Sequence, residues 1–363
     1  MTGEQTAIFS RRLTALRSAL KPKRCDAFIT SHAASLRYLC GYTGSNGLLI
    51  VSPSSSLFLT DFRYREMMQT EVAAGRKRIA KGSLIQFAVK TGAVDGLRRI
   101  AFEKDHLTVA SFETVRACIG PKRVILTSGI VESLRAVKDN TELQSLTAAF
   151  DISDKVFRHV LGIVRPGMTE LELSAEISYK HKQLGAENDS FDVIVASGIR
   201  GALPHGTATD KKLAPREFIT LDFGCLYRGY HSDMTRTICL GRPTPEMKNV
   251  YAIVKDAQQR GCDRVRSGVK AKTVDAAARR TIAAKGYGKF FGHSLGHGVG
   301  LDIHELPRIA PKSSDILRNG NVVTIEPGIY LPGRFGIRIE DTVIVRDHGC
   351  EVLTASPKEL III

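Results

Sequence analysis

Hydrophobic and polar positions over the first 130 residues alternate between helical and strand-like periods. A helical period over 5–20 precedes a short apolar run at 26–29. The runs GLLIVS (47–52) and LFLT (57–60) predict neighbouring strands across the turn SPSSS, and RRIAFEK and KRVILTS flank a helical segment around 108–119. Helices that alternate with short apolar strands predict an α/β domain. This stretch contains no phosphate-binding glycine loop and no nucleophile elbow.

From about residue 135 the pattern changes to paired helices followed by longer β segments. Residues 141–164 carry a helical apolar period. Thr169, with Glu172 three residues later, predicts a capping box that opens a second helix ending near Gly185. The run FDVIVAS (191–197) then predicts a strand.

A second set of elements follows the same plan. Residues 217–241 predict two strands joined through a turn at 227–229. Two further helices are expected near 245–266 and 273–285, the second capped by Thr273. The last region, with NVVTIEPGIY and GIRIEDTVIVRD, is strand-like again.

A weak internal repeat links these two sets. VRPG at 164–167 and VRSG at 265–268 stand 101 residues apart, and so do Gly185 and Gly286, which end the helices that follow. Self-similarity at a fixed period indicates a duplicated unit. We therefore expect an α+β fold: a smaller α/β domain at 1–130 and a second domain at 131–363 with pseudo-two-fold halves.

Composition is that of a globular protein, with 43% hydrophobic and 25% charged residues. No apolar run approaches the roughly 18 residues of a membrane span, and the start has no secretory signal. The seven cysteines lack CxxC spacing, which favours free thiols in a reducing cytoplasm. The net charge is +15, but the basic residues are scattered, so nucleic acid is not the expected partner and the meaning of this charge stays open.

Four acidic residues and one histidine form a candidate metal site. LDFG places Asp222 inside an apolar strand, and HSDMTRT places Asp233 on the returning strand. GHG holds His297, IEPG holds Glu326, and IRIED holds Glu340, which also reads as an inward-facing strand residue. Carboxylates in apolar strands are costly unless they are paired or bound to a cation. This oxygen-rich set suits Mn²⁺ or another divalent ion, and two ions about 3.5–4 Å apart would use all five ligands.

The ordered motifs SFDVIVASG, LPHG, LDFG, GYHSDMTRT, GHSLGHGVGLDIHE, IEPGIY and GIRIED resemble the pita-bread metallopeptidases, specifically their Xaa-Pro aminopeptidase and prolidase branch. LRYLCGYTGSNG (36–47) and LTDFRYR (59–65) resemble the amino-terminal domain of that branch, although Cys40 stands where a threonine is expected. The resemblance implies a pita-bread catalytic domain at 131–363. It also implies that the five residues above are the metal ligands, with two divalent ions, Mn²⁺ first and Co²⁺ or Zn²⁺ as alternatives.

The same resemblance implies roles for further residues. His205 in LPHG is expected to contact substrate and shuttle protons, and Glu326 to take the proton of the nucleophile. His293 and His304 are expected to line the pocket and to hydrogen-bond the scissile carbonyl or its tetrahedral intermediate. His293 could instead orient a metal ligand. The other histidines belong to no motif: His32, His106, His159, His181, His231 and His348.

Arg338 lies two residues before Glu340, so the two are expected to share a strand face. Family likeness implies that Arg338 braces the metal carboxylates, with a plain surface arginine as the alternative. The glycines of FGHSLGHGVGLDIHE (291–305) are interpreted as backbone that lets metal and substrate approach closely.

The expected activity is that of an Xaa-Pro aminopeptidase, which hydrolyses the amino-terminal Xaa-Pro bond of short peptides. Prolidase activity on Xaa-Pro dipeptides is the first alternative, because loops decide how the pocket closes. Methionine aminopeptidases lack the extra α/β domain, and creatinase-like hydrolases lack the metal set. A metal-free pita-bread protein that binds nucleic acid is the alternative outside the enzyme class. The resemblance also implies a homodimer, in which the first domain helps to close the pocket.

Overall fold

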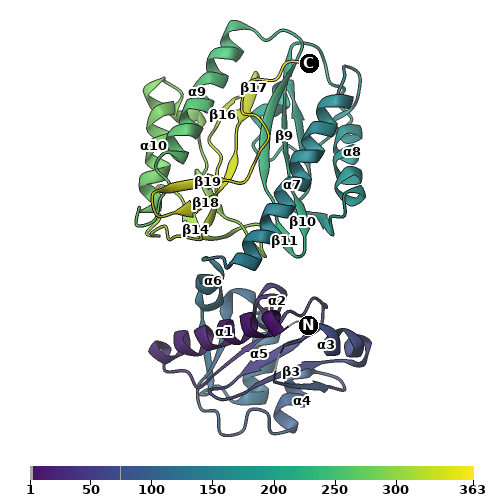
Figure 1. Ribbon diagram of the computed structural model, residues 1–363, viewed down its shortest axis with the longest axis vertical. Helices are drawn as coiled ribbons and strands as arrows, with labels where there is room; N and C mark the ends of the chain where they lie inside the picture. The colour runs from purple at the N-terminus through teal and green to yellow at the C-terminus, as the bar shows by residue number, and fades with distance from the viewer. Residues whose placement is uncertain (1–2, 74) are drawn as a thin grey trace. The chain divides into compact units, whose positions relative to one another are not determined.

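The computed structural model describes residues 3–73 and 75–363, so residues 1, 2 and 74 of the expected first domain lie outside the described residues. The chain divides into two compact units, Met1–Arg135 and Ala136–Ile363 (Figure 1). The expected domain ranges, 1–130 and 131–363, stay a prediction. No helix in the described ranges is long and apolar enough to span a bilayer.

The first unit is built on one six-stranded sheet with the order β4-β3-β2-β1-β5-β6. β1, β5 and β6 run parallel, β2 is antiparallel to both β1 and β3, and β4 is parallel to β3. The strands are β1 (Ala27–Thr30), β2 (Leu48–Val51), β3 (Ser56–Thr60), β4 (Arg76–Ile79), β5 (Ile100–Glu103) and β6 (Val124–Thr127). The helices are α1 (Gly3–Leu20), α2 (Ala33–Cys40), α3 (Arg65–Glu71), α4 (Leu84–Lys90), α5 (Val109–Ile119) and α6 (Ile130–Arg135).

Every residue of β1, β2 and β5 is buried, as expected for strands covered on both faces. α4 and α5 cover one face through Ile85, Ala88, Val115 and Ile119, which join the sheet residues in one core cluster. The predicted α/β unit is therefore confirmed, with strand positions close to those expected.

The second unit contains two helix pairs, each followed by antiparallel strands. α7 (Asn140–Ile163) and α8 (Glu170–Gln183) precede a three-stranded sheet of order β12-β9-β8. α9 (Pro245–Cys262) and α10 (Ala271–Ala284) precede a five-stranded sheet of order β14-β13-β15-β18-β19 and the β16-β17 hairpin. Each helix pair packs on its own core cluster, and Figure 1 shows the pairs on opposite sides of the strands. The duplicated α+β architecture is thus confirmed.

The strands of the second unit are short, with β9 and β12 the longest. Those of its first half are β7 (Asn188–Asp189), β8 (Ile194–Ser197), β9 (Glu217–Phe223), β10 (Cys225–Tyr227), β11 (Tyr230–His231) and β12 (Met234–Leu240). Those of its second half are β13 (Gly296–Gly298), β14 (Glu305–Ile309), β15 (Val322–Ile325), β16 (Gly328–Leu331), β17 (Phe335–Arg338), β18 (Asp341–Arg346) and β19 (Gly349–Val352).

The two predicted helix caps have different outcomes. Thr169 and Glu172 form the predicted capping box at the start of α8. Thr273 is not a cap, because α10 already begins at Ala271. The Ala271 amide donates to the carbonyl oxygen of Asp315 at 2.9 Å. A backbone contact from a distant segment therefore satisfies the first N–H of a helix that begins two residues before the expected cap.

Two glycines of 291–305, Gly296 and Gly298, lie against neighbouring backbone. A Cβ at Gly296 would overlap the carbonyl oxygen of Thr324, and one at Gly298 would overlap that of Leu306. These oxygens belong to the neighbouring backbone of β15 and β14. At Gly296 and Gly298 the missing side chain thus lets strands approach each other, a purpose that the sequence did not indicate. Close approach of metal and substrate stays a prediction for the motif.

Gly296→Ala should lower the free energy of unfolding by about 2–3 kcal/mol, because the new methyl group must displace main-chain atoms in a packed sheet. Gly292→Ala is the matched control four residues away, since a Cβ there meets nothing within 4 Å. Denaturant unfolding of both variants measures the difference. Equal stabilities would contradict the backbone explanation.

Candidate metal centre

The two aspartates come from the β9–β12 hairpin of the second unit. Asp222 is the sixth residue of β9, and the antiparallel register pairs it with Thr235. Asp233 was expected within the returning strand, but β12 begins only at Met234. Asp233 therefore lies in the segment that joins the two strands, next to the end of β9 that carries Asp222.

The two glutamates come from the other half of the unit. Glu326 directly follows β15. Glu340 lies in the two-residue break between β17 and β18, so it is not inside a strand as expected. The physical reason is a change of partner: the Glu340 amide donates to the Thr235 carbonyl oxygen at 3.1 Å, where the chain passes from the hairpin to the five-stranded sheet. Its side chain still points the same way as that of Arg338, because both contact Thr235 Oγ1.

These elements bring all five expected ligands together. Asp222, Asp233 and Glu340 each offer a carboxylate oxygen, and these atoms lie within 4.8 Å of one another. The Nε2 atom of His297 lies 3.5 Å from Asp233 Oδ2 and 3.4 Å from Glu326 Oε1. Side chains from three separate parts of the sequence, around 222–233, 297 and 326–340, thus meet at one site.

Neighbouring groups orient the ligand atoms. Thr235 Oγ1 donates to Glu340 Oε2 at 2.8 Å, and Thr324 Oγ1 donates to Glu326 Oε1 at 3.2 Å. The Nδ1 atom of His297 is 3.1 Å from the Gly298 carbonyl oxygen. A carbonyl can only accept, so Nδ1 carries the proton and Nε2 presents its lone pair towards the carboxylates.

The chemistry of this cluster fits a bound cation. Asp222 Oδ1 and Glu340 Oε1 are buried, and neither finds a hydrogen-bond partner within the described ranges. Burial, followed by repulsion between the carboxylates, raises the pKa of Asp233 and Glu340 well above the usual range. Burial also raises the pKa of Glu326 to about 8 and lowers that of His297 to about 4. A divalent ion suits such a site, because it binds carboxylate oxygens that lack hydrogen-bond partners and the lone pair of a neutral imidazole.

Arg338 is buried at the edge of this cluster, so it is not a surface arginine. Its Nη2 atom forms an ion pair with Asp222 Oδ2 at 2.5 Å, and Nε donates to Thr235 Oγ1 at 3.0 Å. Its Nη1 atom donates to Tyr330 Oη at 2.7 Å and to the Pro204 carbonyl oxygen at 3.1 Å. The guanidinium therefore neutralises one ligand oxygen and connects the hairpin to the residue before His205.

The three non-ligand histidines differ in their surroundings. His304 is exposed, and its ring meets that of His297 edge-on at 4.3 Å between centroids. His205 is also exposed and lies in the turn after Pro204. His293 is engaged at both nitrogens: Nδ1 is 2.8 Å from the Ser294 carbonyl oxygen, and Nε2 is 3.0 Å from Tyr330 Oη. Burial lowers the pKa of His293 to about 4.

Sequence reasoning assigned no role to Tyr330, Thr235 and Thr324, although all three contact the site. Tyr330 links Arg338 to His293, and the two threonines direct the glutamates. Tyr330 and Thr235 lie inside quoted motifs, IEPGIY and HSDMTRT, but a hydroxyl in a motif does not reveal which side chain it will meet.

Both units match known families. Residues 144–347 match the model of metallopeptidase family M24, and residues 12–137 match that of the creatinase/prolidase N-terminal domain. An Xaa-Pro dipeptidase of Pyrococcus horikoshii is 35% identical over 338 residues, which cover 93% of this chain and 94% of that protein.

Two solved structures are similar along nearly the whole chain. The Xaa-Pro dipeptidase from Bacillus anthracis matches with a TM-score of 0.95 and 42% identity, covering 98% of this chain and 100% of that one. The X-Pro aminopeptidase from Thermotoga maritima matches with a TM-score of 0.89 and 38% identity, covering 95% and 100% respectively.

Proposed function

Because the chain belongs to metallopeptidase family M24, in its prolidase and Xaa-Pro aminopeptidase branch, and is a metallo-exopeptidase, we propose that it is an Xaa-Pro dipeptidase. The observation that carries this choice is its likeness to the Bacillus anthracis Xaa-Pro dipeptidase over the full length of that structure. The Pyrococcus horikoshii relative carries the same name. These likenesses favour prolidase activity, the first alternative, over the Xaa-Pro aminopeptidase activity that was expected first. The Thermotoga maritima likeness keeps aminopeptidase activity as the second candidate.

The proposed cofactor is a pair of divalent ions, Mn²⁺ first and Co²⁺ or Zn²⁺ as alternatives, held by Asp222, Asp233, His297, Glu326 and Glu340. Two carboxylate oxygens without a partner among the described residues, and the hard oxygen-rich donor set, support this assignment. When bound, such ions supply Lewis acidity, which lowers the pKa of water and polarises an amide carbonyl. The ion pair with Arg338 holds one oxygen of Asp222 in position for metal binding.

We assign the proton transfer to Glu326. Thr324 holds its carboxylate, and burial favours its protonated form, so it can accept a proton near neutral pH and release it again. Release matters for an Xaa-Pro bond, because the proline nitrogen is a tertiary amide that has no N–H before cleavage. The leaving nitrogen must therefore receive a proton from the site.

The histidines divide into two roles in this proposal. His205 and His304 are exposed, so their rings can contact the substrate carbonyl and its carboxyl-terminal end. His293 accepts the Tyr330 hydroxyl proton while its own proton goes to the Ser294 carbonyl. With both nitrogens engaged, His293 acts as a positioning residue that holds Tyr330 against Arg338.

The remaining parts of the proposal concern the whole protein. All seven cysteines are free thiols, which supports a reducing cytoplasm. Substrates are short peptides with proline in the second position. The homodimer implied by the family resemblance is kept as a proposal, and we assign no membrane or nucleic-acid partner.

One assay tests the activity. Enzyme stripped of metal and restored with Mn²⁺ is given Xaa-Pro dipeptides and Xaa-Pro-Yaa tripeptides of matched sequence. A dipeptidase should cleave the dipeptides with a kcat/KM at least about tenfold higher, since one methyl-sized misfit already changes kcat/KM by about this factor. The opposite preference would establish the aminopeptidase. Cleavage of neither, with release of amino-terminal Met instead, would overturn both candidates.

Tyr330→Phe should lower kcat/KM about tenfold, because it removes the hydroxyl that joins Arg338 to His293 and leaves His293 Nε2 without this partner. The free energy of unfolding should fall by about 1–2 kcal/mol. Tyr251→Phe is the matched control: its buried hydroxyl donates to the Lys358 carbonyl oxygen, remote from the metal ligands. An equal loss of activity in both variants would argue against the positioning role.

A further inference from the structure

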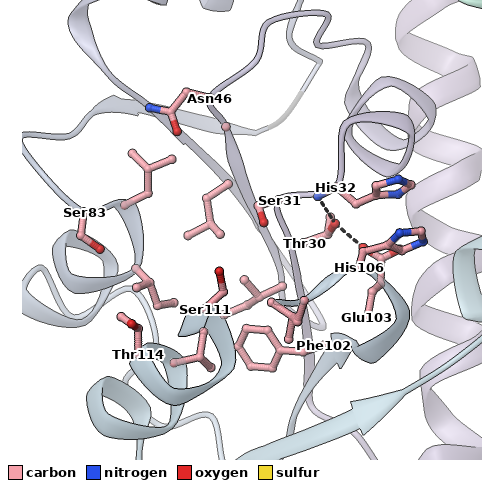
Figure 2. A pocket seen from close by; sticks show the side chains of 17 residues that line it. Thr30, Ser31, His32, Asn46, Ser83, Phe102, Glu103, His106, Ser111 and Thr114 are labelled. Carbon is pink, nitrogen blue, oxygen red and sulfur yellow. Dashed lines mark hydrogen bonds between the residues drawn. The ribbon is translucent and has the colours of Figure 1, made fainter. Parts of the chain in front are cut away.

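A cavity of about 320 Å³ lies in the first unit, at the carboxyl ends of β1 and β5. These strands are parallel neighbours, so their ends meet at the same sheet edge. Open α/β sheets bind ligands at such edges. Figure 2 shows hydroxyl side chains of Ser31, Ser111 and Thr114 around the cavity, with the His32, Glu103 and His106 side chains gathered at one side.

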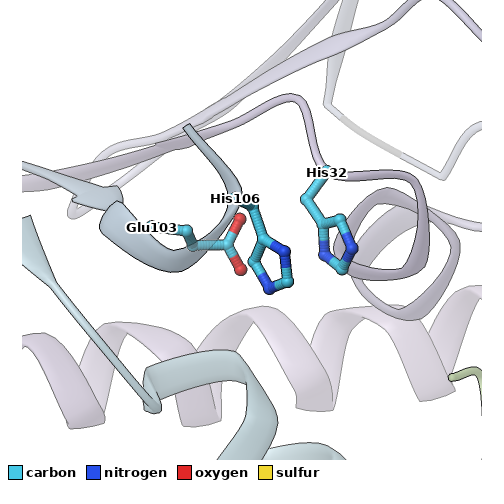
Figure 3. A group of neighbouring side chains, drawn as sticks. All are labelled: His32, Glu103 and His106. Carbon is cyan, nitrogen blue, oxygen red and sulfur yellow. The ribbon is translucent and has the colours of Figure 1, made fainter. Parts of the chain in front are cut away.

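His32, Glu103 and His106 form a second cluster of metal-binding groups. One ligand-capable atom from each lies within 4.8 Å of the others. His32 follows β1 and precedes α2, Glu103 ends β5, and His106 ends the short 3₁₀ helix Lys104–His106. Figure 3 shows the two imidazole rings face to face, with the Glu103 carboxylate next to His106. Their centroids are 3.5 Å apart and the ring planes differ by 6°.

Glu103 is a buried carboxylate that neutral groups hold in place. One oxygen accepts from Thr30 Oγ1, and the other accepts from Ser35 Oγ at 2.6 Å. The side chain is buried, with 6% of the residue exposed. Two hydroxyl donors fix the direction of the carboxylate but do not neutralise it. Buried carboxylates are normally balanced by a cation.

The hydrogen bonds around the two histidines determine their tautomers. Ser35 gives its only hydroxyl proton to Glu103, so Nδ1 of His32 is the donor in their 3.2 Å contact, and Nε2 is the nitrogen that a metal would take. His106 Nε2 lies 3.1 Å from Glu132 Oε1, which makes Nε2 the donor and places the lone pair on Nδ1. A carboxylate behind a histidine in this way is typical of metal ligands.

We propose that His32, Glu103 and His106 bind a divalent transition-metal ion, Zn²⁺, with Glu132 orienting His106. Two imidazoles and one carboxylate form the ligand set of open zinc sites, in which water or another ligand takes the fourth position. The adjoining cavity provides room for that ligand. Binding turns the two rings out of their parallel stack, so that Nε2 of His32 and Nδ1 of His106 converge beside Glu103.

This site differs in chemistry from the centre of the second unit. It offers two nitrogen atoms and one carboxylate, whereas the other centre offers one nitrogen atom and four carboxylates. Imidazole-rich sets favour Zn²⁺ and carboxylate-rich sets suit Mn²⁺. The two sites should therefore differ in their relative affinity for Zn²⁺ and Mn²⁺.

The test counts the metal bound to the full-length protein. Metal-stripped wild type, Glu103→Gln and His106→Ala are dialysed against excess Zn²⁺, and the metal is measured by atomic emission. Each variant should bind one equivalent fewer than wild type. His348→Ala, a histidine outside both clusters, should bind as many equivalents as wild type. The nearly isosteric Glu103→Gln keeps the test decisive if His106→Ala fails to fold.

Dialysis against Mn²⁺ provides the second arm. Wild type and both variants should hold equal amounts of Mn²⁺, since the carboxylate-rich centre is intact in all of them. A wild-type number of Zn²⁺ equivalents in a folded Glu103→Gln protein would overturn the proposal. So would a loss of Zn²⁺ from His348→Ala equal to that from the variants.

Discussion

Glu340→Gln should reduce peptidase activity by at least about 10³-fold while making the metal-free protein more stable. The loss exceeds the roughly 10–100-fold effect of a residue that only supports a metal ligand, because Glu340 itself is an expected ligand. The gain in stability follows from the crowding of buried carboxylates, which raises the pKa of Glu340. A neutral amide removes one of the mutually repelling charges, and we expect a gain of about 1–3 kcal/mol at pH 8.

Lower activity together with higher stability distinguishes this result from simple misfolding. Activity is measured with Mn²⁺ restored, and stability by denaturant unfolding in the presence of a chelator. Glu351→Gln is the control, because that side chain is exposed and paired with Arg346 at the surface. A Glu340→Gln protein that is inactive and also less stable without metal would contradict the crowding argument.

Metal removal should make the stability of the protein depend strongly on pH between 6.5 and 8. In the metal-free fold the pKa of Glu326 is raised from 4.5 to about 8. A raised carboxyl pKa means that the folded state holds protons which the unfolded state has released, so stability falls as pH rises through this window. Glu326 alone contributes a loss of about 2 kcal/mol over these 1.5 pH units, and Asp233 and Glu340 act in the same direction.

The pH range begins at 6.5 because two histidines act below that value. His293 and His297 have a pKa lowered to about 4, so they change stability in the opposite direction, but only below the ordinary histidine value of 6.5. Thermal unfolding at pH 6.5, 7.25 and 8 should show a falling Tm with chelator and no such fall with Mn²⁺. A chelated protein whose Tm is constant across this range would contradict the assigned pKa directions.

Features that depend on neighbouring positions in the chain were predictable from the sequence. The Thr169–Glu172 capping box and the strand periods are local patterns, and both appear in the structure. The five expected ligands were identified because their motifs occur in a recognisable order. The structure brings their side chains together, although their roles stay part of the proposal.

Features that depend on distant backbone were not predictable. The Asp315 carbonyl accepts from the first N–H of α10, and the Thr235 carbonyl accepts from Glu340 between β17 and β18. Gly296 is required by the path of β15, which the motif GHG does not reveal. His32 and Glu103 are separated by 71 positions and share no motif, so only the parallel pairing of β1 and β5 brings them together.

The division of the proposed ligands between the two duplicated halves has a mechanical consequence. Asp222 and Asp233 belong to the first half, whereas His297, Glu326 and Glu340 belong to the second. A metal ion held by both sets cross-links segments that each have their own hydrophobic core. Opening either half destroys the site, so the binding free energy opposes the opening of both. Hydrogen exchange in β9 and in β15 should therefore slow together when metal is added, as a single cooperative unit.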